Sequence, residues 1–272
     1  MRLYSTDLYL TSEYHKILDL VYKFRFINSR QVQKIFGHKV PRRVNPWLKE
    51  LTEHKYLGRI YKRHTLLENT KPAIYYLDNQ GIGWVRGNHF EDHPERVKRF
   101  YQDKTASERF RNHCIAVCDL YVNGIPAKKN EDDEYHFSPL TELWENEELR
   151  NIKPDAHVSI WVKDDITTYF LDLIESYMPM YAIKYKIDQY IELRSETDRW
   201  DIYSYGEDFE NLVIRLILPN QSKLNRVGKY IQERLNESYD IENLKFMLTT
   251  HKKAVEKGIN DKSIWKEVVA EY

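Results

Sequence analysis

The chain has 272 residues, 42% of them hydrophobic, which is enough to bury a core in each of two domains. Its longest apolar runs are strand-sized and broken by charges, and its first residues lack the apolar core of a secretory signal. These features argue against a membrane span and favour a cytoplasmic protein.

The net charge of zero hides an asymmetry along the chain. Residues 1–77 contain 15 Lys and Arg against 6 Asp and Glu, an excess of +9 that the remaining residues balance with −9. Within that remainder, residues 131–150 hold eight acidic side chains and a single basic one, Arg150. A polyanion is therefore expected to meet the first part of the chain and to be repelled by the acidic stretch.

The first 80 residues predict three helices and a hairpin, the pattern of a winged helix-turn-helix. Apolar residues recur at helical spacing, Asn28-Ser29 offers a cap and Gly37 a stop. Asn45 as cap and Pro46 at the first helical position begin the third helix. We expect helices at 12–24, 29–36 and 46–54, and strands at 56–63 and 73–77.

Residues 81–104 are interpreted as a charged connector with three glycines, separating domain 1–80 from domain 105–272. Thr105-Ala-Ser-Glu108 matches a capping box that opens a helix ending at Asn123-Gly124. Apolar strands and helices alternate after it, which is typical of a layered α/β domain and makes the whole chain mixed α and β. Strands are expected at 156–162, 168–174, 211–218 and 244–249, and helices at 105–123, 181–194 and 224–235.

Basic residues gather around the predicted third helix and the hairpin loop. In winged helices the third helix enters the major groove and the wing contacts the DNA backbone or minor groove. Such side chains would neutralise phosphates, and one or two arginines would read guanine edges. The alternative is a solvated basic face used for protein contacts. The candidate DNA-binding residues are Lys39, Arg42, Arg43, Asn45, Lys49, Lys62, Arg63, His64 and Lys71.

Two acids occupy neighbouring predicted strands, Asp155 after a Pro-Asp turn and Asp172 in the next strand. PD-(D/E)xK nucleases hold Mg²⁺ or Mn²⁺ between acids placed in this way and add a lysine two residues after the second acid. Here that position is Ile174, so cleavage would need Lys184 or Lys186 to reach in from the following helix. The alternative is a nuclease-like scaffold without a metal or other cofactor. In that scaffold, repulsion would raise one carboxyl pKa, and Asp172→Asn would be neutral or stabilising.

Other candidates have simpler explanations. Cys114 and Cys118 lie one helical turn apart and supply half of a zinc site or, more simply, two small core residues in a reducing compartment. His113 points about 100° away from Cys114 on the helix and precedes the predicted sheet, where it would approach the two acids or serve as a hydrogen-bonded structural residue. Glu175 would face away from Asp172 on an ideal strand. The 21 tyrosines fall mostly on apolar positions, which favours core packing over base stacking.

The order of segments resembles that of the replication-relaxation family of plasmids and related mobile elements. The similarity covers nearly the full chain and rests on the order and spacing of short motifs. These are Asn45–Leu51, Tyr75–Gly81, the helix around His113, Lys153-Pro-Asp-Ala156, Tyr169-Phe-Leu-Asp172, Lys186-Ile-Asp-Gln-Tyr190, Phe246–Thr250 and Ile264-Trp265.

This resemblance implies a winged helix fused to a restriction-endonuclease-like domain that acts in plasmid replication or DNA relaxation and transfer. The family pattern has glutamate as the second acid and a charged residue two places later, whereas this chain has Asp172 and Ile174. We therefore expect a protein that binds a duplex site, recruits replication or relaxosome proteins and does not cut DNA. A homodimer is compatible with this expectation. A metal-dependent endonuclease using Asp155 and Asp172 and a winged-helix transcriptional regulator are the alternatives.

Overall fold

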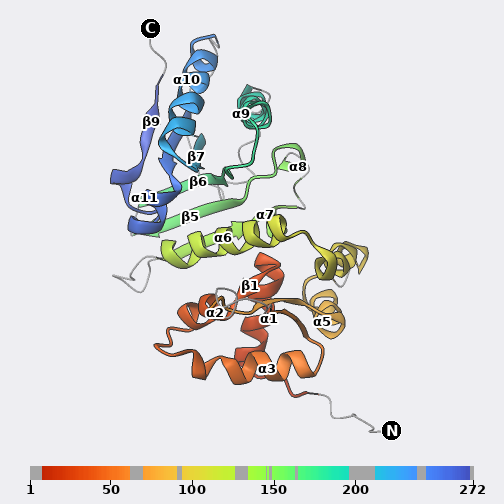
Figure 1. Ribbon diagram of the computed structural model, residues 1–272. Coiled ribbons are helices and arrows are strands. Elements are labelled where there is room, and N and C mark those ends of the chain that lie inside the picture. The colour runs from red at the N-terminus through yellow and green to blue at the C-terminus, as the bar shows by residue number, and fades with distance from the viewer. Residues whose placement is uncertain are drawn as a thin grey trace. The chain divides into compact units, whose positions relative to one another are not determined.

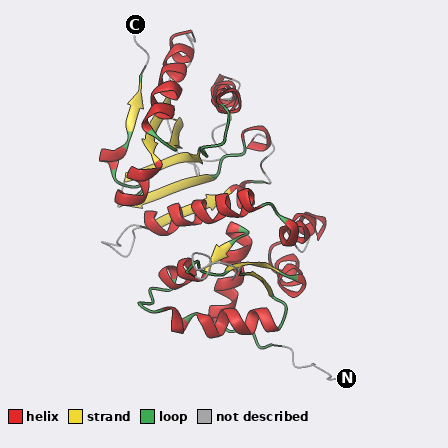
Figure 2. Cartoon of the chain, in the orientation of Figure 1, coloured by secondary structure: helices red, strands yellow, loops and turns green. Residues whose placement is uncertain are grey.

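The computed structural model describes residues 8–61, 70–90, 94–125, 134–144, 146, 149–162, 165–195, 212–237 and 243–269. The chain forms two units, Met1–Val122 and Asn123–Tyr272. Each unit contains helices and strands, so the protein is mixed α and β (Figures 1 and 2). Among the described residues, no helix is long and apolar enough to cross a membrane.

The first unit builds three short antiparallel strands, in the order β1-β3-β2, against a helical layer. Helix α1 buries Ile17, Leu18 and Val21 completely, because these residues share one helical face. The elements of this unit are α1 (Ser12–Phe24), β1 (Ile27–Asn28), α2 (Ser29–Ile35), η1 (Pro41–Arg43), α3 (Asn45–Glu53), β2 (Leu57–Ile60), β3 (Ile74–Leu77), α5 (Asn79–His89), η2 (Pro94–Thr105) and most of α6 (Glu108–Gly124).

The helix starts agree with expectation where a side chain provides the cap. The Asn28 side chain accepts from the backbone N–H of Gln31, and the Gln31 side chain accepts from the N–H of Asn28, forming a reciprocal capping box. The third helix differs by one residue, since Val44 is its cap and Asn45 is already helical. The turn η1 explains the shift, because it brings the backbone at Val44 into the α region and leaves no side-chain cap there.

The segment 81–104 expected as a connector forms α5 and η2 in the first unit. The segment is rich in charged residues, but it also has apolar residues at helical spacing. Two of them, Val85 and Phe100, are at most 1% exposed. The expected capping box at Thr105 is wrong, because Thr105 ends η2. Ser107 is the residue whose hydroxyl accepts from the backbone N–H of Phe110 at the start of α6.

The second unit is a six-stranded sheet in the order β4-β5-β6-β7-β8-β9. Strands β4, β5 and β6 pair antiparallel, β6, β7 and β8 pair parallel, and β9 returns antiparallel to β8. The elements are β4 (Glu134–Pro139), α7 (Leu140–Leu143), α8 (Leu149–Ile152), β5 (Ala156–Val162), β6 (Asp165–Leu173), α9 (Met180–Ser195), β7 (Leu212–Leu218), α10 (Gln221–Glu237), β8 (Leu244–Thr250), α11 (His251–Lys257), η4 (Lys262–Ile264) and β9 (Lys266–Val268).

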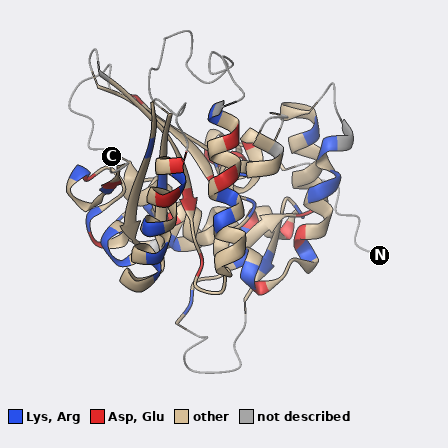
Figure 3. Ribbon diagram, turned by 90° about the horizontal axis from the view of Figure 1, so that it is seen from above, with Lys and Arg blue, Asp and Glu red and all other residues tan. Residues whose placement is uncertain are grey.

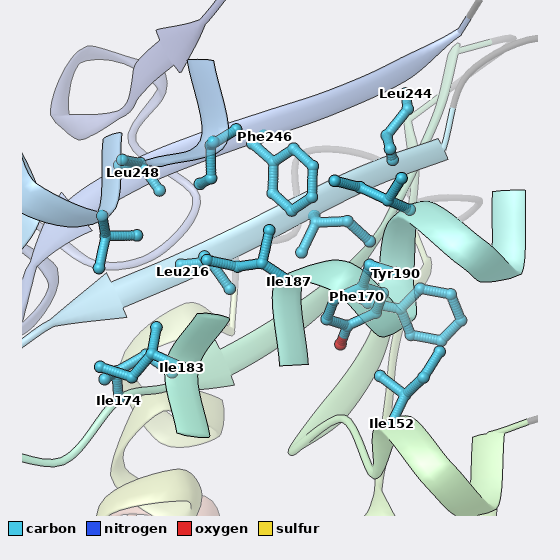
Figure 4. Close-up of a cluster of buried hydrophobic side chains, with 14 of the residues drawn as sticks. Ile152, Phe170, Ile174, Ile183, Ile187, Tyr190, Leu216, Leu244, Phe246 and Leu248 are labelled. Atoms are coloured by element: carbon cyan, nitrogen blue, oxygen red, sulfur yellow. The ribbon is translucent and has the colours of Figure 1, made fainter. Parts of the chain in front are cut away.

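One apolar cluster joins the sheet of the second unit to α9 and α10 (Figure 4). Ile183 and Ile187 of α9 are at most 1% exposed and belong to the same cluster as Leu216 and Phe246 of the central strands. The Tyr190 ring lies 6.2 Å from the ring of Phe170 in the same cluster. Because α9 is packed in this way, polar groups on its Ile187 and Tyr190 side are held close to the end of β6.

Candidate functional site

Helix α3 of the first unit has one buried and one exposed side. Val44, Leu48 and Leu51 are fully buried, while Asn45 and Lys49 are exposed. The acid Glu50 accepts a hydrogen bond from the Tyr14 hydroxyl of α1, and burial together with this bond raises the pKa of Tyr14 to about 12. Glu50 is therefore engaged with α1, and the exposed side of α3 retains Lys49.

A groove of about 530 Å³ lies between α3 and the β2–β3 hairpin. Its lining carries the positive charges of Lys49, Arg59 and Lys71 against the single acid Glu53, whose carboxylate is 3.7 Å from the Lys49 ammonium. The Arg59 guanidinium lies over the Tyr61 ring at 4.9 Å. The complete lining is Ser29, Asn45, Lys49, Thr52, Glu53, Arg59, Tyr61, Lys71, Pro72, Ala73 and Tyr75.

The predicted DNA-binding residues fall into three groups. Asn45, Lys49 and Lys71 line the groove. Lys39, Arg42 and Arg43 are exposed in the turn that precedes α3. Lys62, Arg63 and His64 lie outside the described residues. Figure 3 shows the lysines and arginines of the chain in blue and the acids in red, alternating along several helices.

Arg59 and Tyr61 are groove residues that sequence reasoning missed. The strand expected at 56–63 contains both residues, but the sequence prediction takes its basic residues from positions next to the hairpin loop. Arg59 is opposite Tyr75 in the β2–β3 register, and its side chain is exposed. The two-residue period of a strand gave no signal for Arg59, because it places Arg59 on the same face as the fully buried Leu57.

In the second unit, Asp155 and Asp172 come together as expected, where β5 begins and β6 ends. Ala156 and Leu171 are the last residues that pair there between β5 and β6. Beyond them, the side chains of the two acids form hydrogen bonds between the two strands. The Asp155 N–H donates to Asp172 Oδ1 at 3.1 Å, and the Leu173 N–H donates to Asp155 Oδ2 at 2.7 Å. The acid pair therefore satisfies backbone donors that the ladder leaves over.

Lys186 and Tyr190 reach the same acid from α9, four residues apart on one helical face. The Lys186 ammonium donates to Asp172 Oδ1 at 2.5 Å, and the Tyr190 hydroxyl donates to Asp172 Oδ2 at 2.8 Å. Asp172 and Tyr190 are fully buried. Burial raises the pKa of Asp172 and Asp155 adds to the rise, whereas Lys186 opposes it; burial and Asp172 raise the pKa of Tyr190.

Of the two lysines considered from sequence, only Lys186 approaches the acids. The Lys184 ammonium lies 4.3 Å from the centroid of the Tyr230 ring of α10, on the exposed side of α9. Ile174, which stands where a nuclease lysine was sought, is 2% exposed in the apolar cluster. Tyr190 was not recognised from sequence as part of this group, because its position also fits a core residue.

The arrangement does not fit a divalent cation in its present form. Carboxylate and carbonyl oxygens are suitable hard donors for Mg²⁺ or Mn²⁺. However, the Asp172 carboxylate already accepts three hydrogen bonds, two at Oδ1 and one at Oδ2, and its side chain has no exposed surface. Within the part of the chain that the structure describes, no three His, Cys, Asp or Glu side chains form a cluster able to hold a metal.

The fold and these two sites define a mixed α and β protein of two units, with a basic groove in the first and a buried acid–lysine cluster in the second. The chain matches the family model described as Replication-relaxation over residues 18–204, which is more than half of its length. It belongs to the replication-relaxation family. The matched range includes Arg59, Asp155, Asp172 and Lys186. No curated protein and no solved structure matched the chain.

Proposed function

We propose that the first unit is a winged helix-turn-helix that binds double-stranded DNA, with α3 as the recognition helix and the β2–β3 hairpin as the base of the wing. The element order α1, β1, α2, α3, β2, β3 and the strand order β1-β3-β2 support this assignment. In such domains the third helix enters the major groove and the wing contacts the adjacent backbone or minor groove.

The observation that carries the proposal is the basic groove between α3 and the hairpin. Lys49, Arg59 and Lys71 line its two sides, so a phosphodiester strand lying in it would meet cations from helix and hairpin together. Arg42 and Arg43 stand exposed before α3, where their side chains would approach base edges or flanking phosphates. The excess charge of +9 within residues 1–77 favours a polyanion over a protein partner.

Membership of the replication-relaxation family supports a role in the replication, relaxation or transfer of plasmid or mobile-element DNA. In this proposal the protein binds a duplex site and recruits replication or relaxosome partners through its second unit. The protein would act by positioning its partners on the DNA and not by catalysis, because hydrogen bonds within the chain already occupy the nuclease-like acid pair. The proposal requires no metal.

Affinity measurements on the full chain test the recognition surface. Replacing Arg42 and Arg43 together with alanine should weaken binding to a specific duplex by about tenfold or more, since each contact with a base edge or phosphate contributes on the order of 1 kcal/mol. The matched control is Lys252→Ala with Lys253→Ala, which removes the same charge from exposed positions in α11. Equal losses from both pairs would overturn the assignment of α3.

Mapping of the bound DNA across chromosome and plasmids separates this role from transcriptional regulation. Sites close to a replication or transfer origin are expected. Binding confined to promoters would favour the winged-helix regulator instead.

The close approach of Lys186 to Asp172 is the one observation that favours a nuclease, because it supplies the cation that Ile174 lacks. We nevertheless expect no cutting of linear, supercoiled or single-stranded DNA with Mg²⁺ or Mn²⁺. Cleavage by the purified protein that disappears in Asp155→Ala would establish the endonuclease in place of the placement role.

A further inference from the structure

The acid pair of the second unit contains a fixed positive charge supplied by the chain itself. The Lys186 ammonium donates to Asp172 Oδ1 at 2.5 Å and to the backbone carbonyl of Lys153 at 3.0 Å. Its side chain is 18% exposed, so it is largely withdrawn from water. A carboxylate oxygen and a backbone carbonyl oxygen converging on one point are hard donors of the kind that bind divalent cations.

We propose that the Lys186 ammonium is the resident cation of a masked divalent-cation site formed by Asp155, Asp172 and the Lys153 carbonyl. With both acids ionised, the three side chains carry a net charge of −1. Without Lys186 the charge would be −2, confined to two carboxylates already linked through backbone donors. Such a pair attracts a doubly charged cation, since like charges held together are costly.

Packing fixes the helix from which the Lys186 side chain extends. Helix α9 is anchored by Ile183, Ile187 and Tyr190, each at most 1% exposed. The loop that leads into α9 is held from α10, where the Lys223 ammonium donates to the carbonyls of Ser176 at 3.0 Å and Met178 at 2.6 Å. Because the helix is fixed, a metal ion could enter only by displacing the Lys186 ammonium from its two acceptors, Asp172 Oδ1 and the Lys153 carbonyl. The native chain is therefore insensitive to divalent cations at this site.

The test is the thermal stability of the full chain with millimolar Mg²⁺, Ca²⁺ or Mn²⁺ and with a chelator. The midpoint of the native chain should be the same in all four conditions. Lys186→Ala should be less stable with the chelator and should regain about 5 °C or more with at least one cation, as expected when a ligand binds only the folded state. Adding Asp172→Asn to Lys186→Ala should abolish that gain.

Two further variants separate charge from packing. Lys184→Ala removes an exposed lysine from the same helix and should leave the protein insensitive to metal. Lys186→Arg keeps the charge and should do the same. If Lys186→Ala does not fold, Lys186→Gln removes the charge with less loss of volume, and Mn²⁺ bound per chain is counted by electron paramagnetic resonance.

The proposal predicts one Mn²⁺ for Lys186→Gln and none for the native chain at this site. It is overturned if the native chain shows a metal-dependent midpoint that Asp172→Asn removes. It is also overturned if neither Lys186→Ala nor Lys186→Gln responds to any of the three cations. DNA binding by the first unit is measured separately and is not needed for either result.

Discussion

Asp172 is a buried carboxylate that accepts three hydrogen bonds, from the Asp155 N–H, the Lys186 ammonium and the Tyr190 hydroxyl. Asp172→Asn would turn an amide NH₂ toward donors and remove the carboxylate that forms the ion pair with Lys186. We expect a loss of about 3–5 kcal/mol in unfolding free energy, measured by denaturant titration. Glu192→Gln, at an exposed acid of α9, should change stability by less than about 0.5 kcal/mol. An Asp172→Asn variant as stable as the native chain would contradict the donor count.

Sequence alone favours the opposite sign for this substitution. The linear chain reveals two acids with matching strand positions but not the donors that surround them. The pairing of Asp155 with Asp172 was predictable, because a Pro-Asp turn and the apolar strands determine their places. It was not predictable that Lys186 and not Lys184 contacts Asp172, since this depends on how α9 is rotated about its axis. That rotation is determined by Ile183 and Ile187 packing against the sheet.

His157 gives the second unit a pH dependence. The side chain is 8% exposed, and burial lowers its pKa to about 4 from an ordinary 6.5. It therefore stays neutral in the fold while the unfolded chain takes up a proton below pH 6.5. Its contribution to stability is complete above pH 6.5 and is lost as the pH falls toward 4, at roughly 1.4 kcal/mol per pH unit.

His157→Gln should remove this loss while keeping a hydrogen-bonding partner for the Thr168 hydroxyl, which lies 2.7 Å from His157 Nε2. The measurement is the difference in unfolding free energy between neutral pH and about pH 5 for both proteins. The raised carboxyl pKa values of Asp103 and Asp172 act in the other direction and cancel in the comparison. Equal pH profiles would show that His157 is charged or solvated in the fold.

At the scale of elements, the β2–β3 hairpin depends on a close approach at Gly58. A Cβ there would lie 2.1 Å from the Tyr76 ring on the partner strand, and both residues are opposite each other in the register. Gly58→Ala should destabilise the first unit by about 1–3 kcal/mol through overpacking. It should also weaken DNA binding, because Arg59 follows directly. Gly83→Ala in α5, where nothing lies within 4 Å, is the control and should be neutral or stabilising. Comparable destabilisation by both alanines would exclude the ring contact as the cause.

Periodicity located the elements that bury a regular face. Helix α1 and strand β5 have the expected bounds, because α1 buries residues at helical spacing and β5 buries four residues in succession. Strands β1, β4 and β9 were not predicted. Strand β4 has only Phe137 and Pro139 buried, and β9 has no buried residue, so edge strands of this kind lack the signal that burial imposes. Their pairing partners, distant in sequence, determine that they are strands.

At the scale of the whole molecule, DNA binding should depend steeply on salt. Arg42, Arg43, Lys49, Arg59 and Lys71 are exposed cations on the proposed surface. If each of them neutralises one phosphate, the logarithm of affinity should fall with the logarithm of salt with a slope of about −4.5. Arg59→Ala should reduce the slope by about one, whereas Lys252→Ala in the second unit should leave it unchanged. A flat salt response would contradict the electrostatic account.

The strand connections of the second unit also impose an order in time. Strands β5 and β6 are neighbours in sequence and pair antiparallel, so they form quickly, whereas β6 and β7 pair parallel across a connection that contains α9. The hairpin alone brings Asp155 beside Asp172, and Lys186 arrives only when α9 docks. We therefore expect the two carboxylates to meet during folding before the ammonium reaches them. Refolding should then be slower at neutral pH than at a lower pH, where one carboxyl is protonated.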